Sequence, residues 1–93
     1  MYLTKIKILI AGEFGDKHYE MTIGCEKMMG YALCYSHDQY EPTTDLTDLI
    51  IRKNYPRIEF EGKFYSNADY QVEGTHLSIN LNNYNTDSNE KED

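Results

Sequence analysis

Positive charge is scarce in this chain of 93 residues, because sixteen Asp and Glu outnumber nine Lys and Arg and give a net charge of −7. The imbalance lies in one part of the chain. Residues 1–35 carry four acids and four bases, whereas residues 36–93 carry twelve acids and five bases. Nucleic acids and anionic membranes select for clustered Lys and Arg. The sequence therefore argues against both as direct partners and permits a partner with a basic protein surface.

A long apolar run is also missing. No stretch of about 18 apolar residues occurs, so we expect no membrane-spanning helix. The apolar segment at residues 1–12 is short and is interrupted by Lys5 and Lys7 at alternate positions, which favours a strand over a signal peptide. We therefore expect a cytoplasmic protein.

Cysteine is rare, with Cys25 and Cys34 as the only two in the chain. Two cysteines do not make a disulfide framework, and in a reducing cytosol we expect both to be buried thiols. The alternative is a zinc site in which His37, three residues after Cys34, joins both cysteines. Zinc signatures have two close ligand pairs and this chain has one, so we expect no metal and no other cofactor.

Catalytic motifs are lacking as well. The six glycines form no phosphate-binding loop. Ser36, His37 and Asp38 have the side chains of a catalytic triad, but adjacent residues cannot converge as a triad does. The sequence therefore predicts a protein that is not an enzyme.

What the chain does contain is alternating apolar sequence. Residues 2–10 and 18–23 alternate with period two, which predicts an antiparallel hairpin with Ile6 and Ile8 on one face. Residues 25–36 fit either a short helix or a strand. A strand over residues 30–35 is favoured, since a glycine in the middle of a helix costs about 1 kcal/mol relative to alanine.

A short helix is predicted at about residues 45–54. Thr43 or Thr44 would cap its start. Asp45 and Asp48 would lie in the first turn, and two basic residues would lie in the last, as the helix dipole favours.

Two further hairpins are predicted towards the C-terminus. In the first, a three-residue loop over residues 60–62 pairs Glu59 with Lys63 and Ile58 with Phe64, which matches charge with charge and apolar with apolar.

In the second hairpin, a two-residue loop at Glu73 and Gly74 pairs Tyr70 with Leu77 and Ala68 with Ile79. The predicted fold is thus α+β, a mostly antiparallel sheet of five to seven strands with one short helix packed on it. Residues 1–85 would form one domain, and residues 86–93 an acidic disordered tail.

Tryptophan is absent, whereas tyrosine occurs nine times. Tyrosine is enriched at recognition surfaces, and nine are too many for the core of so small a domain. Four acids without a base lie between residues 38 and 48, near two tyrosines. The alternative reading of these acids is a solvated loop followed by a helix start. The predicted partner-binding surface has six members: Asp38, Tyr40, Glu41, Asp45, Asp48 and Tyr55.

The favoured hypothesis is a small acidic protein-binding module, an inhibitor or adaptor that engages a basic, nucleic-acid-handling site on a larger protein. Phage and mobile-element anti-defence proteins, anti-CRISPR proteins among them, offer an analogy of size and charge. One alternative is a structural or assembly subunit that forms homo-oligomers, and a less favoured one is a small Cys/His metal-binding protein. The first predicts salt-sensitive binding, the second self-association and the third stoichiometric zinc.

Overall fold

The computed structural model describes residues 1–37 and 45–83. Seven antiparallel strands form one sheet in the order β5-β4-β1-β2-β3-β7-β6, and the predicted α+β fold is confirmed. The strands are β1 (Tyr2–Ile10), β2 (Lys17–Met28), β3 (Tyr31–Ser36), β4 (Arg57–Phe60), β5 (Lys63–Tyr65), β6 (Tyr70–Glu73) and β7 (His76–Asn80). The described helices are α1 (Leu46–Arg52) and two 3-10 turns, η2 (Asn67–Asp69) and η3 (Leu81–Asn83).

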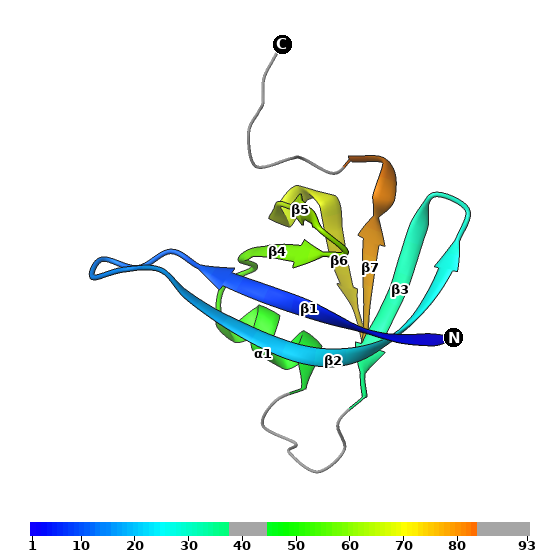
Figure 1. Cartoon of the computed structure of the whole chain (residues 1–93), viewed down its shortest axis with the longest axis horizontal. Helices are drawn as coiled ribbons and strands as arrows, with labels where there is room; N and C mark the ends of the chain where they lie inside the picture. Colours follow the sequence, from blue (N-terminus) through cyan, green and yellow to red (C-terminus); the bar gives the residue numbers. More distant parts are fainter. Residues whose placement is uncertain (38–44, 84–93) are drawn as a thin grey trace.

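The sheet curls around the helix. β1 and β2 run as a long pair across the molecule, and β3, β7 and β6 run at a steep angle to them (Figure 1). α1 contacts β3 and β7. We call the sheet face that shares a core with α1 the inner face, and the opposite one the outer face. No helix among the described residues has the length and apolarity needed to cross a bilayer.

Alternation along each strand determines which side chains reach the core. On β1, Ile6 and Ile8 are fully buried and the intervening Lys7 is not. Burying one such side chain contributes about 1.5–3 kcal/mol. Every strand and α1 contribute to the core, which consists of Ile6, Ile8, Ile23, Cys25, Ala32, Cys34, Leu46, Leu49, Ile50, Ile58, Phe60, Tyr65, Tyr70, Leu77 and Ile79.

The ambiguous segment is extended, as favoured from the sequence. β2 continues past Ile23 to Met28, and β3 pairs with it antiparallel. Gly30 lies in the turn between them with φ 87°. L-residues rarely adopt this conformation, so the glycine ends one strand and starts the next rather than interrupting a helix.

The helix is shorter than predicted, and its cap is a different residue. The carboxylate of Asp45 accepts the Thr47 backbone N–H at 3.1 Å, so Asp45 is the N-cap. The two threonines proposed for this role from the sequence lie outside the described residues. At the other end Asn54 is left-handed, with φ 64°, and its N–H donates to the carbonyl of Ile51. This left-handed turn ends the helix ahead of the predicted position.

The β4–β5 hairpin has a two-residue loop, so the predicted three-residue loop is wrong. Glu61 and Gly62 both have positive φ, 53° and 80°, as a type I′ turn requires. Ile58 therefore pairs with Tyr65 and not with Phe64.

The core residue of β5 is Tyr65 and not Phe64, the aromatic residue that the predicted register assigns to it. Tyr65 is 2% exposed, whereas Phe64 lies on the outer face opposite Glu59, which we had expected to pair with Lys63. The guanidinium of Arg57 lies 5.0 Å from the centre of the Phe64 ring. This cation–π contact places an aromatic among charged neighbours, and apolar pairing rules do not anticipate it.

The last hairpin is also shifted from its predicted register. Its loop consists of Gly74 and Thr75, so Tyr70 pairs with Ile79 and not with Leu77. Gly74 has φ 64° at the first loop position, which a type II′ turn requires.

Residues 67–69 leave the strand, which is why the predicted pairing of Ala68 with Ile79 does not form. The carboxylate of Asp69 accepts the Ser66 backbone N–H at 2.9 Å, and the Ser66 hydroxyl accepts the Ala68 N–H at 3.3 Å. This capping box makes η2 in place of a strand. The predicted tail and the predicted domain end at residue 85 lie outside the described residues.

Candidate functional site

The structure describes half of the predicted partner-binding surface. Asp38, Tyr40 and Glu41 lie outside the described residues. Asp45, Asp48 and Tyr55 lie along and just beyond α1.

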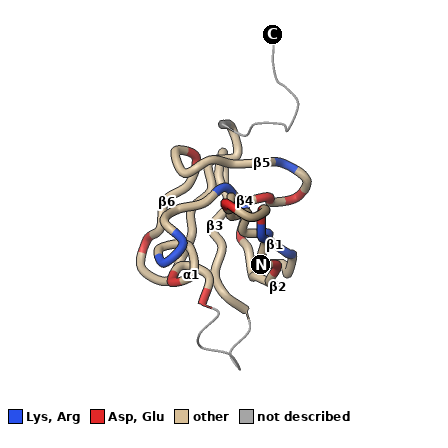
Figure 2. Tube along the Cα trace, turned by 90° about the vertical axis from the view of Figure 1, so that its left-hand side faces the viewer, with Lys and Arg blue, Asp and Glu red and all other residues tan. Residues whose placement is uncertain are grey.

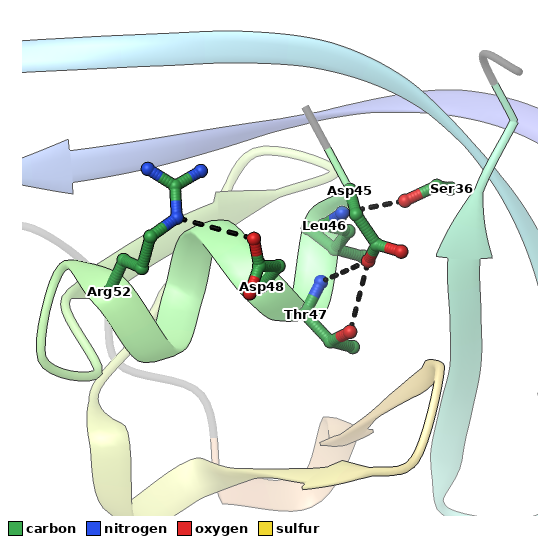
Figure 3. Close-up of polar contacts among 6 residues, drawn as sticks. All are labelled: Ser36, Asp45, Leu46, Thr47, Asp48 and Arg52. Carbon is green, nitrogen blue, oxygen red and sulfur yellow. Dashed lines mark hydrogen bonds and ion pairs between the residues drawn. The ribbon is translucent and has the colours of Figure 1, made fainter. Parts of the chain in front are cut away.

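Asp45 has a structural role at the start of α1. Its carboxylate accepts hydrogen bonds from the backbone N–H and the hydroxyl of Thr47, at 3.1 and 3.0 Å (Figure 3). The Leu46 N–H donates to the hydroxyl of Ser36 at 2.6 Å, which ties the helix start to the end of β3. The acid at position 45 is therefore explained by helix capping, the alternative that the sequence left open.

Asp48 and Tyr55 are both exposed, Asp48 in the first turn of α1 and Tyr55 beyond its last turn. The carboxylate of Asp48 forms an ion pair with Arg52 at 3.3 Å, and the two side chains are 60% and 50% exposed. Such pairs contribute little to stability. Tyr55, beyond the last turn, is 41% exposed and has φ 56°. Of the described residues of the predicted surface, Asp45 thus caps α1, whereas Asp48 and Tyr55 are exposed.

A different surface, which the sequence did not reveal, lies on the outer face of β1, β2 and β3. Three large apolar side chains there are strongly exposed: Leu3 at 51%, Met28 at 41% and Tyr31 at 39%. Leu33 and Tyr35 lie between them at half-buried positions. We call these five residues the aromatic face.

The strand register aligns the residues of the aromatic face in rows across the sheet. Leu3 pairs with Gly24, Gly24 with Tyr35, and Tyr35 with His76, so four strands present one continuous row. A Cβ atom on Gly24 would lie 2.7 Å from the Tyr35 ring, which shows that the ring covers the glycine backbone. The His76 ring meets Tyr35 edge-on, with centroids 5.4 Å apart. Tyr35 is therefore held in place by its packing on Gly24 and His76.

A hollow of about 350 Å³ adjoins Tyr31 at the β7–β6 side of the aromatic face. Its walls include the polar side chains of Gln71, Ser78 and Asn80. These groups offer hydrogen-bond acceptors beside an aromatic ring.

The charge around the aromatic face differs between its two sides. β3, β6 and β7 contain no Lys or Arg, and the β3 and β6 traces carry no blue segment in Figure 2. Glu26 lies on the outer face as the cross-strand partner of Leu33, Glu73 lies beside His76, and the exposed Lys5 follows Leu3 on the same face of β1. The aromatic face thus has an acid on its β6–β7 side and a base, Lys5, on its β1 side.

One sequence signal could have indicated this surface. In β3 the large residues Tyr31, Leu33 and Tyr35 alternate with the small residues Ala32 and Cys34. Alternation alone does not say which set is inward, and large apolar residues are normally assigned to the core. Here the small set is inward, fully buried on the face that α1 contacts.

The two cysteines lie together on the inner face. Cys25 and Cys34 are direct cross-strand partners, their Sγ atoms are 2.9 Å apart, and both are fully buried. His37 is exposed. Within residues 1–37 and 45–83, no group of three or more His, Cys, Asp and Glu is arranged to hold a metal ion.

Three polar side chains form a connected group beside the cysteines. The Tyr2 hydroxyl donates to the Glu61 carboxylate at 2.7 Å, and the Lys27 ammonium lies 2.6 Å from the same carboxylate. Burial raises the pKa of Glu61, but the hydrogen bonds from Lys27 and Tyr2 outweigh burial and hold that pKa below its usual value. Burial and the bond to Glu61 raise the pKa of the Tyr2 phenol.

The sulfurs titrate as a pair. The hydrogen bond between them lowers the pKa of Cys25, against the opposing effect of burial, and it raises the pKa of Cys34. Coupled groups of this kind release the first proton more easily than the second. Cys25 is therefore the more nucleophilic thiol of the two.

Comparison with models of protein families, with curated proteins and with solved structures found no match to this chain.

Proposed function

We propose that this chain is a small non-enzymatic protein-binding module, an inhibitor or adaptor that engages a basic, nucleic-acid-handling site on a larger protein. Mobile-element anti-defence proteins are the functional type that we have in mind. The observation that carries the proposal is the aromatic face, where Leu3, Met28 and Tyr31 are 51%, 41% and 39% exposed.

The composition of the aromatic face supports a binding role. Protein interfaces are enriched in Tyr and Met and depleted of Lys at their centres. Residues that contribute most to binding energy are mainly Trp, Tyr and Arg, seated in well-packed surroundings. Tyr31 beside the hollow and Tyr35 against Gly24 fit this description, since one is accessible and the other is held rigidly.

Charge indicates the nature of the partner. Glu26 and Glu73 lie within and beside the aromatic face, β3, β6 and β7 carry no base, and the chain has a net charge of −7, while Lys5 lies at the β1 side of the face. Complementary charge steers association and suppresses wrong partners. A partner surface with Arg or Lys side chains suits both the acids and the tyrosine rings, because a guanidinium stacks favourably on an aromatic ring.

The test is binding to a partner captured from the native host. The purified pair is compared by calorimetry for wild type, for Tyr31→Ser and for Phe14→Ser. Phe14 is the matched control, because it is 98% exposed and lies in the β1–β2 turn, away from the aromatic face. We expect Tyr31→Ser to weaken binding at least about tenfold, or about 1.4 kcal/mol, with Phe14→Ser unchanged.

Salt provides the second part of the test. Affinity of the wild type is expected to fall as ionic strength rises, since exposed charges are screened. Equal binding by wild type and Tyr31→Ser, or an affinity insensitive to salt, would contradict the proposal.

Self-association is the alternative with an observation of its own. β6 lies at one end of the strand order, so one of its edges pairs with no other strand in the described sheet. Such edges can pair with a second copy. Sedimentation of the wild type separates the two functions, because the alternative predicts a concentration-dependent dimer and the proposed function predicts a monomer that pairs with another protein.

A further inference from the structure

We propose that Cys25 and Cys34 are a redox modification site, in which glutathione disulfide converts the thiol pair into a reversible intramolecular disulfide. The inference is independent of the proposed binding function. It rests on the register of β2 and β3, on the contact between the two sulfurs and on the polar group beside them.

The fold holds the two sulfur atoms close to bonding distance. The two residues are direct Cα partners in the antiparallel ladder, and their sulfurs are 2.9 Å apart. A disulfide bond is about 2.05 Å long, so the sulfurs need to approach by less than about 1 Å. Directly opposed cysteines on neighbouring strands can close this distance without any change of register.

The surroundings favour a nucleophilic sulfur. The hydrogen bond from Cys34 is the largest effect on the pKa of Cys25 and stabilises its thiolate; the Lys27 charge adds to that effect, whereas burial and the Glu61 charge oppose it. The thiolate is the species that attacks a disulfide. A second thiol in contact with the first then resolves the mixed disulfide rapidly.

Access comes through the polar group and not through the apolar core. Tyr2 is the cross-strand partner of Cys25, and it is held by its hydrogen bond to Glu61. The Lys27 and Glu61 side chains are 49% and 31% exposed. Breaking surface hydrogen bonds at a strand end requires only local opening, which occurs at far lower free energy than global unfolding.

The reaction balances in two exchanges. The Cys25 thiolate attacks one sulfur of glutathione disulfide, which forms a mixed disulfide and releases one glutathione thiolate. Cys34 then loses its proton and attacks the Cys25 sulfur, which forms the protein disulfide and releases the second glutathione thiolate. Two protein thiols are oxidised, and one glutathione disulfide is reduced to two thiols.

The first experiment uses the wild-type protein. It is incubated in buffers with an increasing ratio of glutathione disulfide to glutathione. Each sample is quenched with acid and alkylated, and the mass of the protein is measured by mass spectrometry. We expect a species that has lost two hydrogens and takes up no alkyl group, and that returns to the dithiol with dithiothreitol. The oxidised protein is expected to melt several degrees higher, because the new bond closes a loop in the unfolded chain.

The second experiment assigns the order of attack. Cys34→Ser should accumulate a stable glutathione adduct on Cys25, since no thiol remains to resolve it. Cys25→Ser should react much more slowly, because Cys34, the thiol that remains, forms less of the reactive thiolate. If either variant fails to fold, cross-linking of both thiols in the reduced wild type by phenylarsine oxide reports whether the pair acts as a vicinal dithiol.

Two results would overturn the proposal. One is a wild-type chain that keeps two alkylatable thiols in excess glutathione disulfide. The other is a chain that ends with glutathione on both cysteines and no internal bond.

Discussion

At residue 24 the absence of a side chain is required by a neighbouring ring. The Tyr35 ring would lie 2.7 Å from a Cβ atom at this position. We expect Gly24→Ala to destabilise the fold by about 1–3 kcal/mol through overpacking. In a Tyr35→Ala background the same change should cost much less, because the clash is gone. Urea unfolding of the four proteins measures this coupling, and additive effects would show that the ring does not pack there.

Ile79 tests the inner face at the same scale. It is fully buried in β7 and pairs with Ala32 and Tyr70 on its two sides. We expect Ile79→Ala to cost about 2–4 kcal/mol, the range for large-to-small changes in a core. Ser78→Ala, next to it on the outer face, is the control and should change stability by less than about 0.5 kcal/mol. Equal denaturation midpoints for both variants would contradict the assignment of faces.

Glu61 gives a pH dependence with a defined sign. Its pKa is lowered in the folded chain by the hydrogen bonds from Lys27 and Tyr2, despite the opposing effect of burial. The unfolded chain has a carboxyl pKa of about 4.3. A lowered folded pKa adds stability that is complete above the unfolded value and is lost as pH falls through the folded one.

The measurement for Glu61 compares melting temperatures between pH 7 and pH 3. Wild type should exceed Glu61→Gln at pH 7, and the difference should shrink below about pH 4.3 as the carboxyl is protonated. Glu26→Gln, at an exposed outer position, is the control and should track the wild type. A difference that stays constant with pH would show that the ion pair does not form.

At the scale of elements, α1 depends on one acid more than on the other. Asp45 accepts two hydrogen bonds at the N-cap, whereas Asp48 has an exposed ion pair with Arg52. We expect Asp45→Ala to cost about 0.5–2 kcal/mol and Asp48→Ala less than about 0.5 kcal/mol. Thermal melts of the two variants give the comparison. The reverse order would mean that the cap bonds do not stabilise the helix.

Most elements followed from the sequence, except that η2 forms where a strand was predicted. The turn types and the assignment of residues to the two sheet faces did not follow. Period-two alternation identified β1, and the acid-rich start with a basic end identified α1. Both late hairpins were placed in the wrong register, because the φ angles of Glu61 and Gly74 decide the loops and apolar pairing does not. The burial of Tyr65 in preference to Phe64 depends on the curl of the sheet, which a local pattern does not contain.

At the scale of the whole molecule, the candidate site differs from the surface predicted from charge. That surface relied on acids near the helix start, and one of them caps the helix. Strand pairing brings together the five residues of the aromatic face, Leu3, Met28, Tyr31, Leu33 and Tyr35. No spacing rule joins Leu3 to Tyr35 across a β-sheet, so single-sequence reasoning could find the tyrosines but not their arrangement.

The measurement that tests the central claim most directly is a map of the contact surface on the bound protein. Backbone amide shifts of isotopically labelled protein are followed while the captured partner is added. We predict that the largest changes fall on residues 31–35 and 76–80, with smaller ones at the β1–β2 turn and along α1. Changes concentrated on residues 45–55, with β3 and β7 unaffected, would contradict the aromatic face as the binding surface.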